Sequence, residues 1–399
     1  MSWEMVRLED LTENGFMIDG DWIESKDQDP SGDIRLLQLA DIGEGYFINK
    51  SNRFINRETS EKLKCTFLKK NDILIARMPD PIGRACLFPF EAENSYVTVV
   101  DVCVMRTKKE IDRKYVTYAI NSPDFRNKIA SQITGTTRLR ISGKKLKDLQ
   151  IPLPPFPIQK RIAEILDAAD ALKRKDQALL KKYDELAQAI FIDMFGDPDR
   201  NPNNFSLKDL SSICIEVVDC PHSTPIHTEE ITNYPCIRTS EMKNGKIVWN
   251  KMKYLNYENY LIRVKRLTPK AGDIVYAREG TYGEAIILPE GYEFALGQRT
   301  MLLRLDPKKC DNYFICHFIN SDFVYKQAKR KNMGSTVGHV NVADVKKFQI
   351  LLPPLELQEK FGDILKLIHA QITSISKKYL SEELFQTLLQ KAFKGELVN

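Results

Sequence analysis

The chain contains 399 residues, of which 43% are hydrophobic and 28% are charged, and its formal net charge at pH 7 is +5. No apolar run approaches the roughly 18 residues of a membrane span, and the N-terminus has no basic segment followed by an apolar one. We therefore expect a cytoplasmic globular protein with no membrane partner. The eight cysteines form no Cys-x-x-Cys pair, which argues against a zinc ribbon or a thioredoxin-like site.

The strongest pattern in the chain is a repeat whose two copies lie 199 to 201 residues apart. The stretch Ile151–Gln159 recurs as Ile350–Gln358, an offset of 199, and Arg77 is answered by Arg278, an offset of 201. A duplication with so long a period predicts two structurally equivalent halves, each large enough to bury its own core.

Short segments within each half favour regular structure. Four segments are rich in β-branched and apolar residues and are predicted to be strands, namely 71–77, 96–104, 273–278 and 298–305. The matched segments 112–131 and 311–331 favour helices. Each half therefore begins with a mixed α/β globular part.

A long amphipathic helix is predicted at the end of each half. The proline pairs 154–155 and 353–354 cannot lie inside a helix, so they mark a rigid junction where each globular part ends. Beyond them apolar residues recur at three- and four-residue steps, over 158–195 and again over 357–393. Helices of roughly 55 Å are too long for one small domain to cover, so we expect them to pack against each other. The residues expected at this packing are Ile162, Leu166, Leu172, Leu179, Ile190, Phe361, Leu365, Ile368 and Ile375.

The predicted organisation has four parts. Residues 1–155 form the first globular domain and 156–196 the first long helix; residues 197–354 and 355–399 repeat this arrangement. The turn-forming stretch Gly196–Asn204 ends the first helix. The fold class is α+β, with two α/β domains in pseudo-twofold symmetry separated by two long antiparallel, coiled-coil-like helices.

Basic residues gather at the same place in both halves. Residues 126–147 include Arg and Lys but no acid, and residues 326–347 carry a similar basic set against only Asp344. Such clustering is what a polyanion-binding surface needs, and two solvated helix faces are the alternative.

Two globular parts, each closed by Pro-Pro, a Gln and a long helix reading Gln159-Lys-Arg-Ile-Ala-Glu-Ile-Leu-Asp167, resemble the specificity subunit of type I restriction-modification enzymes. The resemblance covers nearly the whole chain and is most specific from Pro152 to Gly196. In the second helix Lys360 and Phe361 replace the Arg-Ile of the first, so that copy fits more loosely.

This resemblance implies two target-recognition domains, each of which reads one half of a bipartite sequence in double-stranded DNA. It implies that the chain has no catalytic residues and no cofactor of its own. Its partners would be two methyltransferase subunits, which carry S-adenosylmethionine, and, in the full complex, two ATP- and Mg-dependent restriction subunits. Because the two globular sequences differ outside the framework, an asymmetric target is expected.

Candidate DNA-binding residues come from the matched basic stretches and strand ends. The loops Gly135–Ser142 and Gly334–Asn341 could hold phosphates through hydroxyls and backbone N–H groups, or they could be structural turns. Arg77 and Arg278 end matched strands and either touch DNA or form internal ion pairs. Exposed lysines would neutralise the DNA backbone without reading sequence. The full set is Arg77, Arg138, Arg140, Lys144, Lys145, Arg278, Lys329, Lys331, Ser335, Thr336, His339 and Lys346.

Other functions are weighed against this interpretation. Cys214, Cys220, His222 and His227 have a spacing that fits no common zinc pattern, so no metal site is expected. A coiled-coil scaffold with two protein-binding domains is one alternative. A specificity partner of a fused methylase-nuclease is another, and a nuclease or methyltransferase with unrecognised motifs is a third.

Overall fold

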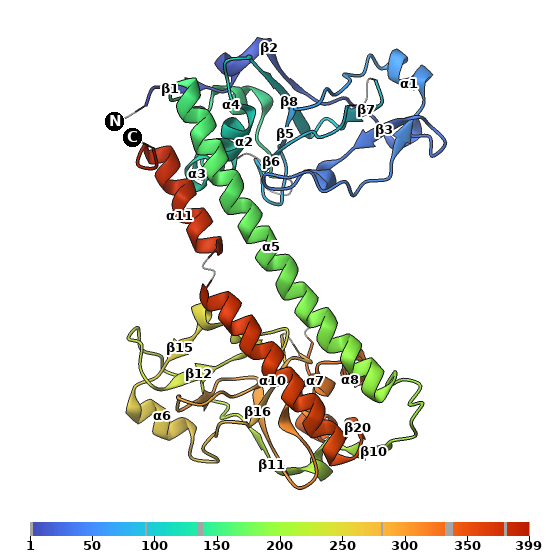
Figure 1. Cartoon of the computed structure of the whole chain (residues 1–399), viewed down its shortest axis with the longest axis vertical. Coiled ribbons are helices and arrows are strands. Elements are labelled where there is room, and N and C mark those ends of the chain that lie inside the picture. The colour runs from blue at the N-terminus through green and yellow to red at the C-terminus, as the bar shows by residue number, and fades with distance from the viewer. Residues whose placement is uncertain are drawn as a thin grey trace. The chain divides into compact units, whose positions relative to one another are not determined.

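The computed structural model describes residues 3–91, 94–133, 139–280, 282–331, 338–378 and 381–398 (Figure 1). The chain divides into two compact units. Unit 1 comprises Met1–Gln177 and Tyr379–Asn399, and unit 2 comprises Ala178–Lys378. The long helix α5 (Phe156–Phe195) is shared between them, and each unit adds one C-terminal helix, α11 (Ser381–Lys394) in unit 1 and α10 (Leu355–Lys378) in unit 2.

Unit 1 is built on a four-stranded antiparallel sheet with the strand order β2-β8-β5-β6. Its strands are β2 (Thr12–Asp19), β8 (Val102–Thr107), β5 (Ile73–Ala76) and β6 (Ala85–Leu87). A second sheet has the order β4-β3-β7, with β4 (Phe54–Ile55), β3 (Ile34–Leu37) and β7 (Tyr96–Thr98), in which β3 and β7 are parallel. The pair β1 (Met5–Arg7) and β9 (Gln150–Pro152) completes the strands described in this unit.

Unit 2 repeats this plan and adds one hairpin. The four-stranded sheet has the order β11-β19-β16-β17, with β11 (Cys214–Asp219), β19 (Thr300–Leu305), β16 (Ile274–Ala277) and β17 (Ala285–Ile287). The smaller sheet has the order β15-β12-β18, with β15 (Lys253–Tyr254), β12 (Pro235–Ile237) and β18 (Ala295–Leu296), and β10 (Ser206–Asp209) pairs with β20 (Gln349–Leu352). The hairpin β13 (Met242–Lys243) and β14 (Lys246–Ile247) has no counterpart among the described strands of unit 1. The two α/β halves that the repeat predicts are confirmed.

The helices also match. Unit 1 has α1 (Arg57–Lys62), α2 (Arg113–Asn121), α3 (Pro123–Ala130) and α4 (Gly143–Asp148), and unit 2 has α6 (Tyr257–Arg263), α7 (Asn312–Ile319), α8 (Asp322–Lys331) and α9 (Val342–Lys346). The helical prediction for 112–131 is realised as two helices because Ser122 is extended and caps α3, accepting from the Phe125 N–H at 3.3 Å, with Pro123 in the first turn. Single 3₁₀ turns connect several of these elements, at Glu9–Leu11, Ser25–Asp27, Leu39–Asp41, Leu210–Ile213, Thr239–Glu241 and Trp249–Lys251.

The central strands β5 and β16 are buried along their whole length because both sheet faces are covered. In β5, Ile73 and Ile75 join the core formed with the helices, whereas Leu74 and Ala76 join a second core on the other face. A strand covered on both faces reads as a continuous hydrophobic run, which is why these segments gave clear strand signals. The predicted strand 96–104 is instead two strands, β7 and β8, separated by residues 99–101.

A buried glutamine fixes each junction between globular part and long helix. Helix α5 starts directly after Pro155, and the Gln159 side chain donates to the Pro154 carbonyl (2.8 Å) and accepts from the Asp112 N–H (2.9 Å). Gln358 makes the same two bonds in unit 2, to the Pro353 carbonyl at 2.7 Å and from the Asp311 N–H at 3.2 Å. The repeated Pro-Pro-x-x-x-Gln pattern therefore joins each long helix to the N-terminal cap of α2 or α7.

Within unit 1, α5 and α11 pack antiparallel (Figure 1). Tyr118 hydrogen-bonds to Asp167 at 2.8 Å, and its ring lies 6.2 Å from that of Phe385. Tyr115, nearly one turn earlier in α2, donates to the carbonyl of residue 152 just before α5 and lies 5.4 Å from the Phe393 ring. The later residues of α5 therefore lie near the earlier residues of α11, as expected for antiparallel helices.

The helix residues expected to pack differ in their burial. Ile162 and Leu166 are fully buried in the unit 1 core, and Phe361, Leu365 and Ile368 are buried in the unit 2 core, where Ile190 is partly buried. Leu172 and Ile375 are half-buried. Leu179 is a correction: its side chain is 39% exposed, and Leu180, about 100° further round the helix, packs against the core in its place. None of the helices among the described residues is both long and apolar enough to cross a membrane.

Candidate nucleic-acid interface

Several of the predicted DNA-binding residues lie at one edge of the four-stranded sheet, where β5 or β16 ends. In unit 1, Arg77 follows β5, and the Arg77 carbonyl accepts from the Ile141 N–H at 3.1 Å. The segment that precedes α4 therefore lies at this edge of the sheet. In unit 2 the Arg278 carbonyl accepts from the Val340 N–H at 2.9 Å. We call these places the strand-end edges. They comprise Asp19, Arg77, Asp101 and Arg140 in unit 1, and Asp219, Arg278, Glu279, Arg299 and His339 in unit 2.

The two strand-terminal arginines form internal ion pairs, the alternative that the sequence left open. Arg77 is only 1% exposed; its guanidinium lies 3.1 Å from Asp19 and donates to the Val100 carbonyl at 2.7 Å. Burial lowers the pKa of Arg77, and Asp19 opposes that shift. Arg278 is 6% exposed and lies 2.7 Å from Asp219. Both arginines therefore lie behind the surface and order the edge, so Arg77 in particular has almost no surface of its own to offer to a base.

The partly exposed members of each edge carry both signs of charge. Arg140 pairs with Asp101 at 3.5 Å, and the two side chains are 39% and 28% exposed. In unit 2, Glu279 is shared between His339 at 2.9 Å and Arg299 at 2.9 Å. Carboxylates paired in this way hold basic side chains in fixed positions. Such an array can present donors and acceptors to base edges.

The candidate lysines lie on short helices next to these edges. Lys144 and Lys145 are in α4, whose N-terminus is capped by Ser142 (from the Lys145 N–H, 3.3 Å), and the Lys145 ammonium donates to the Gln132 carbonyl at 3.1 Å. Lys144 and Lys329 are exposed, and no described carboxylate lies within ion-pair distance of either. Lys331 pairs with Asp344 at 3.4 Å, and Lys346 is half-buried in α9. The remaining candidates Arg138, Ser335 and Thr336, with the centres of both Gly-bearing loops, lie outside the described residues.

The cysteines and histidines of unit 2 are not grouped as a metal site would require. Among the described residues, no set of three His, Cys, Asp or Glu side chains is placed to hold a metal ion. Burial raises the pKa of the Cys214 thiol to about 12.

The sequence reasoning missed the acidic half of each edge. Asp19 and Asp219 hold the strand-terminal arginines, and their offset of 200 falls within the drift of the repeat. A search for matched acids as well as matched bases would have found them. Arg263, which is 5% exposed, was also missed; it donates to the carbonyls of Ser223 and Leu296, at 2.6 Å in both cases.

The family model for the type I restriction modification DNA specificity domain matches this chain twice, over residues 1–182 and 202–384. The chain therefore belongs to the type I restriction-modification specificity family. The expected resemblance is confirmed, and the two matches correspond to two target-recognition domains.

Sequence alignments with specificity subunits of the same family span most of the chain. The type I restriction enzyme MjaVIII specificity subunit of Methanocaldococcus jannaschii is 23% identical over 345 residues, which is 82% of this chain and 80% of that protein. The MjaIX specificity subunit of the same organism is 22% identical over 393 residues, 92% of this chain and 87% of the relative. The crystal structure of the S subunit from M. genitalium has the same fold, with a TM-score of 0.61 at 15% identity over 98% of this chain and 96% of that one.

Proposed function

We propose that this specificity subunit reads a bipartite, asymmetric DNA target, with one target-recognition domain for each half-site. The observation that carries the proposal is that the same edge is built twice with different side chains. The N–H of Arg77 donates to the Asp101 carbonyl and the N–H of Arg278 donates to the Arg299 carbonyl, both at 2.9 Å, so Asp101 and Arg299 are structurally equivalent. One domain presents an acid where the other presents a base.

This exchange of charge supports different half-sites. A carboxylate accepts from an exocyclic amino group such as that of cytosine, whereas an arginine most often donates to guanine, and each good contact discriminates by about 1 to 3 kcal/mol. Arg140 and His339 also occupy equivalent positions, since the residue after each donates to the strand-terminal arginine. Exposed lysines such as Lys144 and Lys329 would add affinity for phosphates that is sensitive to salt and indifferent to sequence.

The chain is proposed to act as a non-catalytic subunit in the cytoplasm. It would recruit two methyltransferase subunits that bring S-adenosylmethionine, and two restriction subunits that use ATP and Mg. A fused methylase-nuclease in place of separate subunits is the closest alternative. The names of the curated relatives, all specificity subunits of type I restriction enzymes, support this assignment of partners.

The direct test is adenine-methylation mapping of a genome in cells that express this chain with the type I methyltransferase of the same organism. Cells with the methyltransferase alone are the control. The proposal predicts a split, asymmetric motif that is methylated only when the chain is present. The same methylation pattern with and without the chain would instead favour the scaffold function.

A further inference from the structure

Both units expose an aromatic ring beside the strand-end edge, at matched positions. Trp22 is 68% exposed, and the His222 side chain is 74% exposed. Their offset of 200 is the offset between Asp19 and Asp219, which lie three residues before them and hold the buried arginines. Trp22 follows β2 in unit 1, and His222 follows the equivalent strand β11 in unit 2, so the two rings lie at the same point of the fold.

In unit 1 the backbone that carries the ring is tightly fixed. The N–H of Gly20 donates to the Val102 carbonyl at 2.8 Å, and the N–H of Asp21 donates to the Thr98 carbonyl at 2.9 Å. A Cβ at Gly20 would lie 2.2 Å from the Thr98 hydroxyl oxygen, so this close approach requires glycine. The carboxylate of Asp21 accepts from the Thr66 N–H at 3.0 Å. Trp22 thus has a rigid base and an exposed ring.

Unit 2 fixes the corresponding backbone with different groups. The buried Arg263 donates to the carbonyls of Pro221 (3.2 Å) and Ser223 (2.6 Å), on either side of His222. The Gln298 side chain donates to the His222 carbonyl at 2.8 Å. Two unrelated sets of hydrogen bonds therefore produce the same result, an exposed ring on an ordered loop.

Each ring adjoins groups already assigned to the strand-end edge. Trp22 lines a recess of about 500 Å³ together with Leu39, Val100 and Asp101, and Asp101 pairs with Arg140. His222 lies 3.6 Å from Asp219, which in turn holds Arg278. The rings and the charged side chains of each edge therefore form one continuous surface.

Single exposed hydrophobic residues are common and need no function. Here, however, an aromatic ring is exposed at the same point of both units, on backbone that is held by hydrogen bonds within the chain. Tryptophan in particular is enriched among the residues that dominate interfaces, and its side chain loses little conformational entropy on binding.

We propose that Trp22 and His222 are specificity-determining residues, each of which contacts bases of the half-site that its own domain reads. The indole offers an apolar face to a thymine methyl group in the major groove, with Asp101 beside it to accept from a neighbouring amino group. The imidazole of His222 offers a hydrogen bond to a base edge. This inference rests on the proposed function, because it names the residues by which that function selects a sequence.

The test is methylation mapping with the complete complex carrying Trp22→Ala or His222→Ala. Trp22→Ala should lower discrimination at one or more base pairs of one half-site by roughly 5- to 150-fold and leave the other half-site unchanged. His222→Ala should do the same to the other half-site only. Leu367→Ala, which removes a side chain that is 69% exposed on helix α10, is the matched control and should leave the motif unchanged.

Two conservative variants guard against misfolding. Trp22→Phe and His222→Gln keep a ring or a hydrogen-bonding group, and each should retain part of the discrimination that its alanine variant loses. If the wild-type complex reads a split motif and all four variants read it with wild-type discrimination, this inference is wrong although the proposed function stands. If the wild-type complex shows no motif that depends on the chain, the proposed function fails and the inference fails with it.

Discussion

The two units share one hydrogen-bonding framework and surround it with different side chains. Asn121 in unit 1 and Asn320 in unit 2 close the same contact: the Asn121 amide accepts from the Ala85 N–H (3.0 Å) and donates to the Ala85 carbonyl (2.8 Å), and Asn320 does the same with Ala285 (2.9 Å for both bonds). The residues next to this contact are unrelated.

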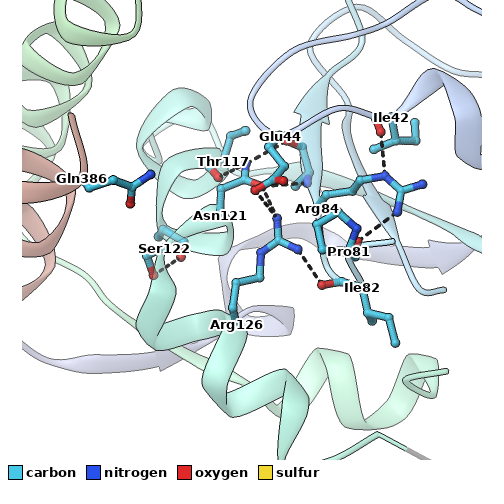
Figure 2. A network of polar contacts seen from close by, with 12 residues as sticks. Ile42, Glu44, Pro81, Ile82, Arg84, Thr117, Asn121, Ser122, Arg126 and Gln386 are labelled. Carbon is cyan, nitrogen blue, oxygen red and sulfur yellow. Dashed lines mark hydrogen bonds and ion pairs between the residues drawn. The ribbon is translucent and has the colours of Figure 1, made fainter. Parts of the chain in front are cut away.

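In unit 1 two arginines, Arg84 and Arg126, lie near the asparagine (Figure 2). Arg84 donates to the carbonyls of Ile42 (2.7 Å) and Pro81 (2.9 Å), and burial lowers its pKa. Arg126 donates to the Ile82 carbonyl at 2.6 Å and to the Asn121 amide oxygen at 3.0 Å, and it pairs with Glu44 at 3.2 Å.

In unit 2 the matched positions of the two arginines hold Glu284 and Tyr325. The Tyr325 ring stacks on Tyr282, with centroids 5.8 Å apart. A cavity of about 800 Å³ opens beside them, and His317 and Asn320 are among the residues that line it. The backbone contacts of the framework therefore tolerate a charged network in one unit and an open cavity in the other. The same freedom allows the two strand-end edges to differ.

The largest expected effect concerns the framework itself. Asp72 makes a bidentate ion pair with Arg106 at 2.8 and 3.1 Å, and Asp273 repeats it with Arg304 at 2.9 and 2.7 Å. Asp72→Asn and Asp273→Asn each leave a guanidinium without its carboxylate, and each should lower the free energy of unfolding of its own unit by about 3 to 5 kcal/mol. Urea unfolding followed by hydrogen exchange measures both units separately.

The control for these variants is Asp33→Asn. Asp33 pairs with Arg57 at 3.0 Å on the surface, where the two side chains are 59% and 46% exposed, so a loss of less than about 1 kcal/mol is expected. A large loss in only one of the two units would show that the matched pairs do not play equivalent roles.

A smaller difference is expected at the place where the units diverge. Arg126→Ala removes the donor for the Ile82 carbonyl and the partner of Glu44, and it should destabilise unit 1 by about 1 to 3 kcal/mol. Tyr325→Ala removes a stacked ring that is 42% exposed, and it should cost unit 2 only about 0.5 to 1.5 kcal/mol. Equal losses in the same unfolding assay would mean that the cavity side is as tightly packed as the arginine network.

The smallest effect is a difference in pH dependence, because all five histidines lie in unit 2. Burial lowers the pKa of His317 to about 4 from an ordinary value of 6.5, and burial also lowers the pKa of His369. Between pH 6.5 and 4 these two histidines bind more protons in the unfolded chain than in the folded one. The free energy of unfolding of unit 2 should therefore fall by about 1 to 2 kcal/mol between pH 7 and pH 5.

Unit 1 carries a shift of the opposite sign. Burial raises the pKa of Asp21 to about 6 from 3.8, so over the same range the folded unit 1 binds more protons than the unfolded chain and gains stability as the pH falls. Hydrogen exchange at pH 7 and pH 5, corrected for intrinsic exchange rates, measures both trends. His317→Leu should remove most of the loss in unit 2, and a parallel loss in both units would contradict this assignment.

The sequence predicted the fold because the framework is periodic. The repeat, the Pro-Pro junctions and the apolar stripe of α5 depend on local chemistry and spacing, so the two equivalent units and the start of α5 after Pro155 could be read directly. The sequence did not show which face of the middle of α5 is buried. Leu179 and Leu180 differ by 100° around the helix, and only the packed partners decide which of them is buried.

The candidate site could be predicted only in part. Clustered basic residues pointed to the strand-end edge of each unit, but a positive charge does not reveal whether an arginine is exposed. Arg77 became a buried partner of Asp19, 58 residues earlier in the chain, a contact that no local pattern encodes. Trp22 gave no signal as a lone aromatic, because its significance depends on the long-range bonds of Gly20 and Asp21 to residues 98–102.

We propose that the two domains share one framework and that each reads its own half-site independently. The most direct test is a chimera in which residues 1–150 are replaced by the equivalent residues of another specificity subunit, followed by methylation mapping with the same methyltransferase. If each domain reads its own half-site, one half-site changes while the other half-site stays as in the wild type. A change in both half-sites would contradict independent reading by the two domains.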